Sequence, residues 1–173
     1  MNGNFGFIHE NLDIKILILY ILHRMNAPVT FDDLTDLTMC DGGISFFDYA
    51  DCVADLVRTE HVQLEDGKYS ATEKGKKNSE ATENNLPLPV RLKAERATHA
   101  FRTAADRDKK IKTFRMQKDD GGYTVRMSLS DGIGEIVSID MLAMNEKHAI
   151  GLERGFRKRA EGIYNDLIEL IFE

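Results

Sequence analysis

The sequence is poor in the residues that mark secreted, zinc-binding or fibrous proteins. Only two cysteines, three prolines and no tryptophan occur among its 173 residues. Cys40 and Cys52 are too few for a disulfide framework, and they lack the CxxC spacing of a zinc site. With 42% apolar and 30% charged residues, the composition is that of a globular chain able to bury a core.

Long apolar runs and targeting signals are missing as well. The longest apolar run, residues 16–22, is far shorter than the roughly 20 residues of a membrane-spanning helix. The first ten residues have neither the basic segment nor the cleavage site of a secretory signal. We therefore expect a reduced, cytoplasmic protein with no membrane partner.

Charge is unevenly distributed along the chain, whose net charge is −6. Residues 1–70 carry 4 basic and 12 acidic side chains, residues 71–118 carry 13 and 6, and residues 119–173 carry 6 and 11. Such blocks mark either a partner surface or a solvated helix that neutralises acidic neighbours. The solvated helix is the commoner explanation in an acidic protein.

Helical periodicity dominates the first sixty residues. Apolar residues over 14–25 follow helical spacing on nearly every face, which predicts a helix buried on more than one side. Thr30 with Asp33 has the capping-box pattern of a short second helix. Ser45 is the expected N-cap of a third helix that ends near Glu60.

A β-hairpin is predicted next, because Asp66-Gly67 is a strong two-residue turn signal. The expected register pairs Val62 with Ala71, Gln63 with Ser70, Leu64 with Tyr69 and Glu65 with Lys68. One face of this hairpin is apolar and the other is polar. Thr72 then caps a fourth helix. Three helices followed by a hairpin is the order of a winged helix, a helix-turn-helix variant with a β wing.

Pro87 and Pro89 mark the expected domain boundary, which gives a winged-helix domain over residues 1–85 and an α+β domain over residues 86–173. The second domain begins with a long helix, whose apolar stripe starts at Val90. The predicted fold class is therefore α+β, with an N-terminal winged helix-turn-helix followed by an α-β-β-β-α domain.

The β-strands of this second domain form a three-stranded antiparallel meander, because apolar and polar residues alternate over residues 111–142. Asn145 caps the helix that follows. Turns at Asp120-Gly121 and near Gly132 set the expected register. The turn at Asp120-Gly121 pairs Phe114 with Met127, Arg115 with Arg126 and Met116 with Val125. An odd loop of three residues near Gly132 pairs Met127 with Val137 and Val125 with Ile139.

Several stretches resemble an uncharacterised bacterial family. They are Gly6-Phe-Ile-His, Leu12-Asp-Ile-Lys-Ile-Leu-Ile-Leu, Asp36-Leu-Thr, Gly43-Ile-Ser-Phe-Phe-Asp, Leu86-Pro-Leu-Pro-Val-Arg-Leu-Lys-Ala-Glu, Asp120-Gly-Gly-Tyr-Thr-Val, Leu129-Ser-Asp-Gly-Ile-Gly-Glu and Leu152-Glu-Arg-Gly-Phe-Arg-Lys-Arg-Ala-Glu. The family is a domain of unknown function with an N-terminal winged helix, and some members are labelled transcriptional regulators. The resemblance implies that fold and a regulatory role, and it supplies no catalytic residues.

Catalytic and cofactor motifs are not found in the sequence. The five histidines, His9, His23, His61, His99 and His148, lie in separate elements without an HExxH pair. Residues 130–135 weakly resemble a phosphate loop, but a strand rather than a helix follows them. We expect no enzyme activity, no metal and no cofactor.

Nucleic-acid binding is the function that a winged helix suggests, and the expected contacts are Ser45, Arg58, Lys68, Lys74, Lys76 and Lys77. The third helix argues against groove reading, because its outward stripe carries Asp48, Asp51 and Asp55, which phosphates repel. Two hypotheses stay open. The first is a dimeric transcriptional regulator that binds DNA through its wing, and the second is a protein-interaction module that uses the acidic helix against a basic partner.

A second cationic cluster lies on the last helix, where Arg154, Arg157 and Lys158 share helical spacing. It is a candidate patch for an anion or a protein partner, unless Glu153 and Glu161 neutralise it locally.

The first and last helices both carry more apolar residues than one face needs. We therefore expect a two-fold homodimer whose interface includes one of these helices. The alternative is that the two helices pack on each other within one chain.

Overall fold

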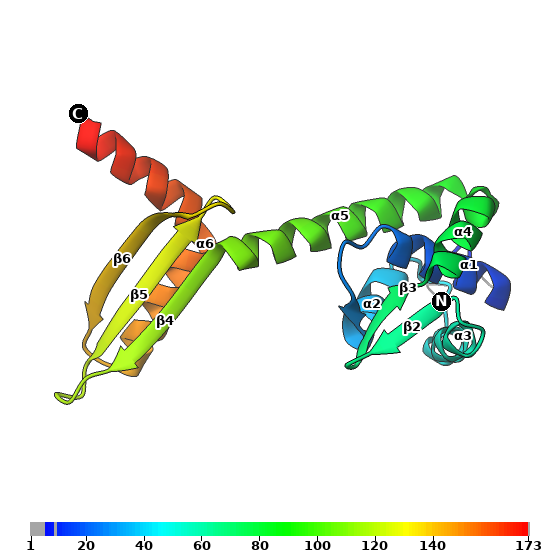
Figure 1. Cartoon of the computed structure of the whole chain (residues 1–173), viewed down its shortest axis with the longest axis horizontal. Coiled ribbons are helices and arrows are strands. Elements are labelled where there is room, and N and C mark those ends of the chain that lie inside the picture. Colours follow the sequence, from blue (N-terminus) through cyan, green and yellow to red (C-terminus); the bar gives the residue numbers. More distant parts are fainter. Residues whose placement is uncertain (1–5, 9, 173) are drawn as a thin grey trace, which may run out of the picture. The chain divides into compact units, whose positions relative to one another are not determined.

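The computed structural model describes residues 6–8 and 10–172, and these residues form a mixed α+β protein (Figure 1). In this part of the chain the helices are α1 (Asn11–His23), α2 (Phe31–Thr38), α3 (Phe46–Arg58), α4 (Glu73–Thr82), the 3-10 turn η1 (Glu83–Asn85), α5 (Leu88–Lys110) and α6 (Glu146–Phe172). The strands are β1 (Val29–Thr30), β2 (Val62–Glu65), β3 (Lys68–Ala71), β4 (Ile111–Gln117), β5 (Tyr123–Ser130) and β6 (Glu135–Ala143). Among the helices described, none has the length and apolar character needed to span a membrane.

The chain divides into two compact units, residues 1–102 and residues 103–173, which we call the N-terminal and C-terminal units. The N-terminal unit is built around α1, which packs against α2, α3, α4 and β3. The side chains of Ile16, Leu19 and Tyr20 keep 4%, 2% and 1% of their surface exposed. The prediction that this helix is buried on more than one side is therefore confirmed.

Side-chain caps fix the starts of three helices. The Thr30 hydroxyl accepts a hydrogen bond from the Asp33 amide at 3.2 Å, and the Thr72 hydroxyl accepts one from the Gly75 amide at 3.1 Å. The side-chain oxygen Oδ1 of Asn145 accepts one from the His148 amide at 2.9 Å. These bonds satisfy amides that have no partner within the helix. These three predicted caps are confirmed, whereas the fourth, Ser45, makes no capping hydrogen bond with its side chain.

The hairpin of β2 and β3 has the predicted register at all four pairs. Its turn has φ of 50° at Asp66 and 74° at Gly67, the positive values that a two-residue hairpin turn requires. A third strand, β1, was not predicted because it is only two residues long. It pairs with β3, setting Val29 opposite Tyr69, so the sheet has the order β1-β3-β2 and all its pairs are antiparallel.

Helix α5 begins between the two prolines that suggested a domain boundary. Val90 and Ala94 of α5 are fully buried in the core of the N-terminal unit, and Phe101 packs against it. The compact N-terminal unit consequently extends to Arg102, rather than to residue 85. The prolines mark the start of a helix whose apolar stripe completes the first core.

The C-terminal unit is an antiparallel sheet of order β4-β5-β6 with α6 packed against it. Val125 and Met127 of the central strand are buried in one cluster with Phe156 and Ala160 of α6. The opposite sheet face carries exposed Phe114. The three-stranded meander and its final helix are as predicted.

The predicted register between β4 and β5 is wrong by one residue. Arg115 lies opposite Val125, and Arg126 lies opposite Phe114, so the two arginines are not paired. The reason is the connecting loop, in which the Lys118 amide donates to the Gly122 carbonyl at 2.8 Å. This bond closes an odd loop where an even one was expected. Arg115 instead joins Glu153, at 3.0 Å, on the α6 side of the sheet.

The predicted register between β5 and β6 is shifted by two residues, although each side chain keeps the expected face. Met127 lies opposite Ile139 rather than Val137, and Val125 lies opposite Met141 rather than Ile139. The loop is longer than the expected three residues. The Asp131 carboxylate organises it by accepting hydrogen bonds from the amides of Ile133 and Gly134, at 2.8 and 2.9 Å.

Candidate interaction surface of the N-terminal unit

Helix α3 buries one face and presents a mixed aromatic and acidic face to solvent. Its buried residues are Tyr49, Cys52, Val53 and Leu56. Phe46 is 52% exposed, and Phe47 is 79% exposed. Asp48 and Asp51 are exposed as predicted. Ser45 holds the N-cap position, but its side chain makes no capping hydrogen bond.

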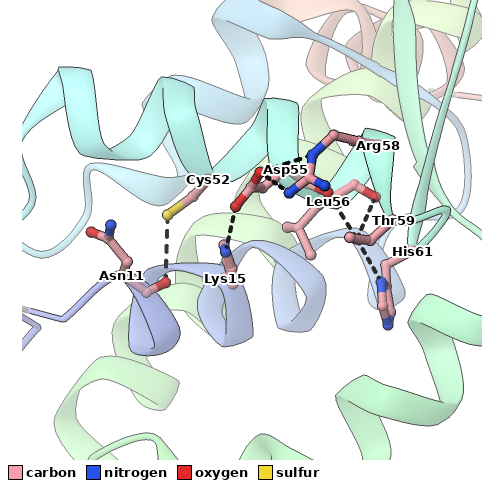
Figure 2. A network of polar contacts seen from close by, with 8 residues as sticks. All are labelled: Asn11, Lys15, Cys52, Asp55, Leu56, Arg58, Thr59 and His61. Carbon is pink, nitrogen blue, oxygen red and sulfur yellow. Dashed lines mark hydrogen bonds and ion pairs between the residues drawn. The ribbon is translucent and has the colours of Figure 1, made fainter.

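The third carboxylate of this helix, Asp55, is already paired inside the N-terminal unit. One oxygen accepts a hydrogen bond from Lys15 of α1 at 2.8 Å, and the other accepts one from Arg58 at 2.7 Å (Figure 2). These two donors lower the pKa of Asp55 to about 2. The candidate DNA contact Arg58 is thus engaged by a carboxylate of its own helix.

The end of α3 is joined to the hairpin and to α4 through His61. The Thr59 hydroxyl lies 2.9 Å from Nδ1 of His61 (Figure 2), and the Asn78 amide nitrogen lies 3.2 Å from Nε2. Burial and the neighbouring Lys74 ammonium lower the pKa of His61. The ring therefore serves as a neutral bridge between three elements.

The four candidate lysines lie in two separate places. Lys68 is exposed at the hairpin turn, opposite Glu65. Lys74, Lys76 and Lys77 belong to α4, which follows β3 at the other end of the hairpin. Lys74 donates to the carbonyl of Thr59, at the end of α3, at 2.8 Å. Lys76 is paired with Glu73 at 2.7 Å. Lys77 is exposed, and no ion pair to it is found among the described residues.

Five aromatic rings form a cluster that sequence reasoning missed. We call this cluster, made by Phe31, Phe46, Phe47, Tyr49 and Tyr69, the aromatic patch. Phe31 of α2 lies at its centre, with its ring centroid 6.3 Å from that of Phe46, 5.5 Å from Tyr49 and 5.9 Å from Tyr69. The adjacent phenylalanines at the start of α3 were the one available signal in the sequence.

Carboxylates border the aromatic patch. Asp32 follows Phe31 on α2, while Asp48 and Asp51 follow Phe47 on α3, and all three are exposed. Burial raises the pKa of Tyr49 to about 12, and the negative charge of Asp32 contributes to the shift. The surface thus combines exposed apolar rings with negative charge.

The candidate patch on α6 is only partly free. Arg157 donates to the Thr113 hydroxyl at 3.1 Å, whereas Arg154 and Lys158 are exposed. The acidic residues expected to neutralise the cluster have other partners. Glu161 pairs with Arg107 at 2.8 Å, which lowers the pKa of Glu161 to about 2, and Glu153 pairs with Arg115.

Metal-ligating residues do not converge in the described part of the chain, where no group of three His, Cys, Asp or Glu side chains could hold an ion. His9 lies outside the described residues. His23 is 3.7 Å from Glu80, and His99 and His148 are exposed. The cysteines at 40 and 52 are free thiols.

Comparison with known proteins places the chain in a family without assigning it an activity. No curated protein and no solved structure matches the sequence. Residues 14–171 match the model of a domain of unknown function, DUF4364. Because the match covers nearly the whole sequence, the protein belongs to the DUF4364 family.

Proposed function

We propose that the N-terminal unit is a winged helix and that the protein is a non-catalytic interaction module whose third helix binds a basic protein partner. The element order and the three-stranded sheet β1-β3-β2 support the winged helix. The observation that carries the binding proposal is the exposed pair of carboxylates, Asp48 and Asp51, on the outer face of α3. This face attracts cations and repels a polyanion.

The internal ion pairs favour a protein partner over DNA. Arg58 and Lys76 each already neutralise a carboxylate, so their contribution to phosphate binding is reduced. For each phosphate contact that is lost, about one counterion fewer is released on binding, so the affinity for DNA falls. A helix lined with acidic residues offers hydrogen-bond acceptors to bases but no donors to the DNA backbone.

A transcriptional regulator that binds DNA is the second candidate. The exposed Lys68 at the hairpin turn and the exposed Lys77 on α4 favour it, because a winged helix meets the DNA backbone with its wing. In this reading the acidic helix stays outside the major groove. A cytoplasmic location belongs to both candidates, and the two free thiols support it.

We expect the protein, immobilised on a resin, to retain basic proteins from a cell lysate at low salt, and a D48N/D51N double variant to retain at least ten-fold less. The substitutions remove two negative charges with little change of shape, so the fold is preserved. D106N/D108N, on α5 in the C-terminal unit, removes two exposed carboxylates elsewhere and is the matched control.

DNA binding is scored in the same preparation by anisotropy with labelled genomic fragments. We expect no complex that resists competitor DNA. A competitor-resistant complex that K68A and K77A weaken would establish the second candidate and overturn the first.

A two-fold homodimer is part of the same proposal, and of the two helices expected at its interface the exposed side chains favour the last one. The apolar surplus of α1 is buried within the N-terminal unit, so α1 offers no dimer surface of that kind. On α6, Tyr164 packs on the core, but Ile168, Ile171 and Phe172 keep 39%, 72% and 82% of their surface exposed. A helix end this apolar favours burial against a second copy.

Light scattering at micromolar concentration should give a mass near twice 19.6 kDa for the wild type. An I171D/F172D variant should give the mass of one chain, because two charges would enter the apolar interface. F114D, on the exposed sheet face, is the control and should stay dimeric. A wild-type mass near 19.6 kDa contradicts the dimer.

A further inference from the structure

The exposure of Phe46 and Phe47 is not explained by the folding of their own unit. Helix α3 is held by four buried residues, one of which is Tyr49 of the aromatic patch, whereas Phe46 and Phe47 keep 52% and 79% of their surface exposed. The Phe47 ring touches only the Phe46 ring among the aromatic pairs of the described residues, at 6.1 Å between centroids. Two neighbouring phenylalanines that stay in water are typical of a surface that a partner covers.

The patch continues from α3 across α2 to the hairpin. Phe31 links the phenylalanines of α3 to Tyr69 of β3. Leu64 of β2 lies directly opposite Tyr69 and is 47% exposed. Ring contacts thus connect Phe47, Phe46, Phe31 and Tyr69 in series, with Leu64 beside Tyr69, and we call these five side chains the strip.

The charge beside this strip selects among the possible occupants. Asp32, Asp48 and Asp51 are all negative, so a second copy of the same strip would meet like charge, and so would a nucleic acid. A cationic segment gains attraction from the carboxylates. Its Lys or Arg side chains also gain from the faces of the exposed rings.

We propose that this strip is a docking site for an amphipathic basic segment of a partner protein, with apolar side chains on Phe46 and Phe47 and Lys or Arg beside Asp48 and Asp51. This inference rests on the proposed function and specifies its partner. A helix that presents apolar residues at positions i, i+3, i+4 and i+7 fits such a strip, while cations on its flanks reach the carboxylates.

The test uses the 173-residue chain and two fluorescein-labelled synthetic peptides. Both peptides have the same lysines at helical spacing. At the i, i+3, i+4 and i+7 positions, one peptide carries leucine and the other carries serine. By fluorescence anisotropy, the leucine peptide should bind at least ten-fold more tightly. F47S should reduce its affinity to that of the serine peptide, and F46S/F47S should do the same. F114S is the control, because Phe114 is an exposed ring of the C-terminal unit.

The outcomes separate the docking site from the function on which it rests. If both peptides bind equally and D48N/D51N abolishes both, the acidic helix binds basic partners and the aromatic docking site is wrong. If F47S leaves the affinity for the leucine peptide unchanged, the peptide binds elsewhere and the inference is again wrong. If neither peptide binds, both the inference and the protein-binding function fail. Binding of a labelled DNA duplex by the protein at low salt, measured in the absence of peptide, favours the DNA-binding candidate instead.

Discussion

Replacement of Gly75 by alanine should destabilise the N-terminal unit by about 3 kcal/mol, because a side chain at this position is forced into backbone. A Cβ atom on Gly75 would overlap the carbonyl oxygen of His61 and would lie 3.3 Å from Cδ2 of Leu19. That carbonyl cannot move freely, since it accepts hydrogen bonds from both the amide and the hydroxyl of Thr72, at 3.1 and 3.2 Å. To make room for the added methyl group, α4 has to shift away from α1 and from the start of the hairpin.

Replacement of glycine by alanine inside a helix usually raises stability. A helical glycine with free space around it is therefore a matched control. G155A on α6 meets no atom within 4 Å, so alanine there should stabilise the C-terminal unit by up to about 1 kcal/mol. Hydrogen exchange of α1 amides during urea titration reports the stability of the N-terminal unit alone. A G75A variant with wild-type protection of α1 would show that α4 does not pack closely on the hairpin.

The hairpin was predictable to the residue because its register is decided within four residues of chain. Asp66 and Gly67 both tolerate positive φ, and only one pairing then separates apolar from polar residues. Three of the four predicted helix caps form for the same reason, as each depends on a side chain and an amide three residues apart, whereas the Ser45 side chain makes no capping hydrogen bond. Local rules suffice where the deciding atoms are close in the sequence.

The meander shows where local rules end. A longer loop closes through hydrogen bonds that composition does not reveal, such as the one between Lys118 and Gly122, and a single residue of difference reverses every side chain of β4. Arg115 therefore faces Glu153 of α6, instead of Arg126. That partner lies 38 residues away, so no sequence pattern near Arg115 indicates it.

One part of the candidate site could also be predicted from local sequence, and the other part could not. The exposure of Asp48 and Asp51 follows from helical spacing within α3, and it was predicted. The aromatic patch was not, because Phe31 and Tyr69 come from elements that only tertiary packing brings to Phe46. The pairing of Asp55 with Lys15 also depends on the contact between α3 and α1. Such ion pairs reduce the number of cationic side chains that are free to bind DNA. A count of charged residues in the sequence does not reveal this reduction.

A buried carboxylate holds the N-terminal segment, and its removal should have an effect as large as that of G75A. Asp41 is fully buried, and its Oδ2 accepts hydrogen bonds from the amides of Phe7 and Ile8 at 2.8 and 3.1 Å. Its other oxygen lies 3.6 Å from Nζ of Lys93 on α5. The chain approaches so closely here that a Cβ on Gly6 would overlap Gly43. One side chain thus links the N-terminal segment, the loop before α3 and α5.

We expect D41A to destabilise the N-terminal unit by about 3 kcal/mol, because hydrogen bonds to a charged group are lost and the amide of buried Ile8 is left without an acceptor. D41N keeps an acceptor oxygen but loses the charge beside Lys93, so a smaller loss of about 1 to 2 kcal/mol is expected. D36A removes an exposed carboxylate of α2 and should stay within about 0.5 kcal/mol of the wild type. Urea titration gives the stabilities, and exchange at the amides of Phe7 and Ile8 locates the effect. If those two amides exchange no faster in D41A than in D36A, Asp41 does not anchor the segment, because an N-terminal segment held by other contacts would keep its protection without the carboxylate.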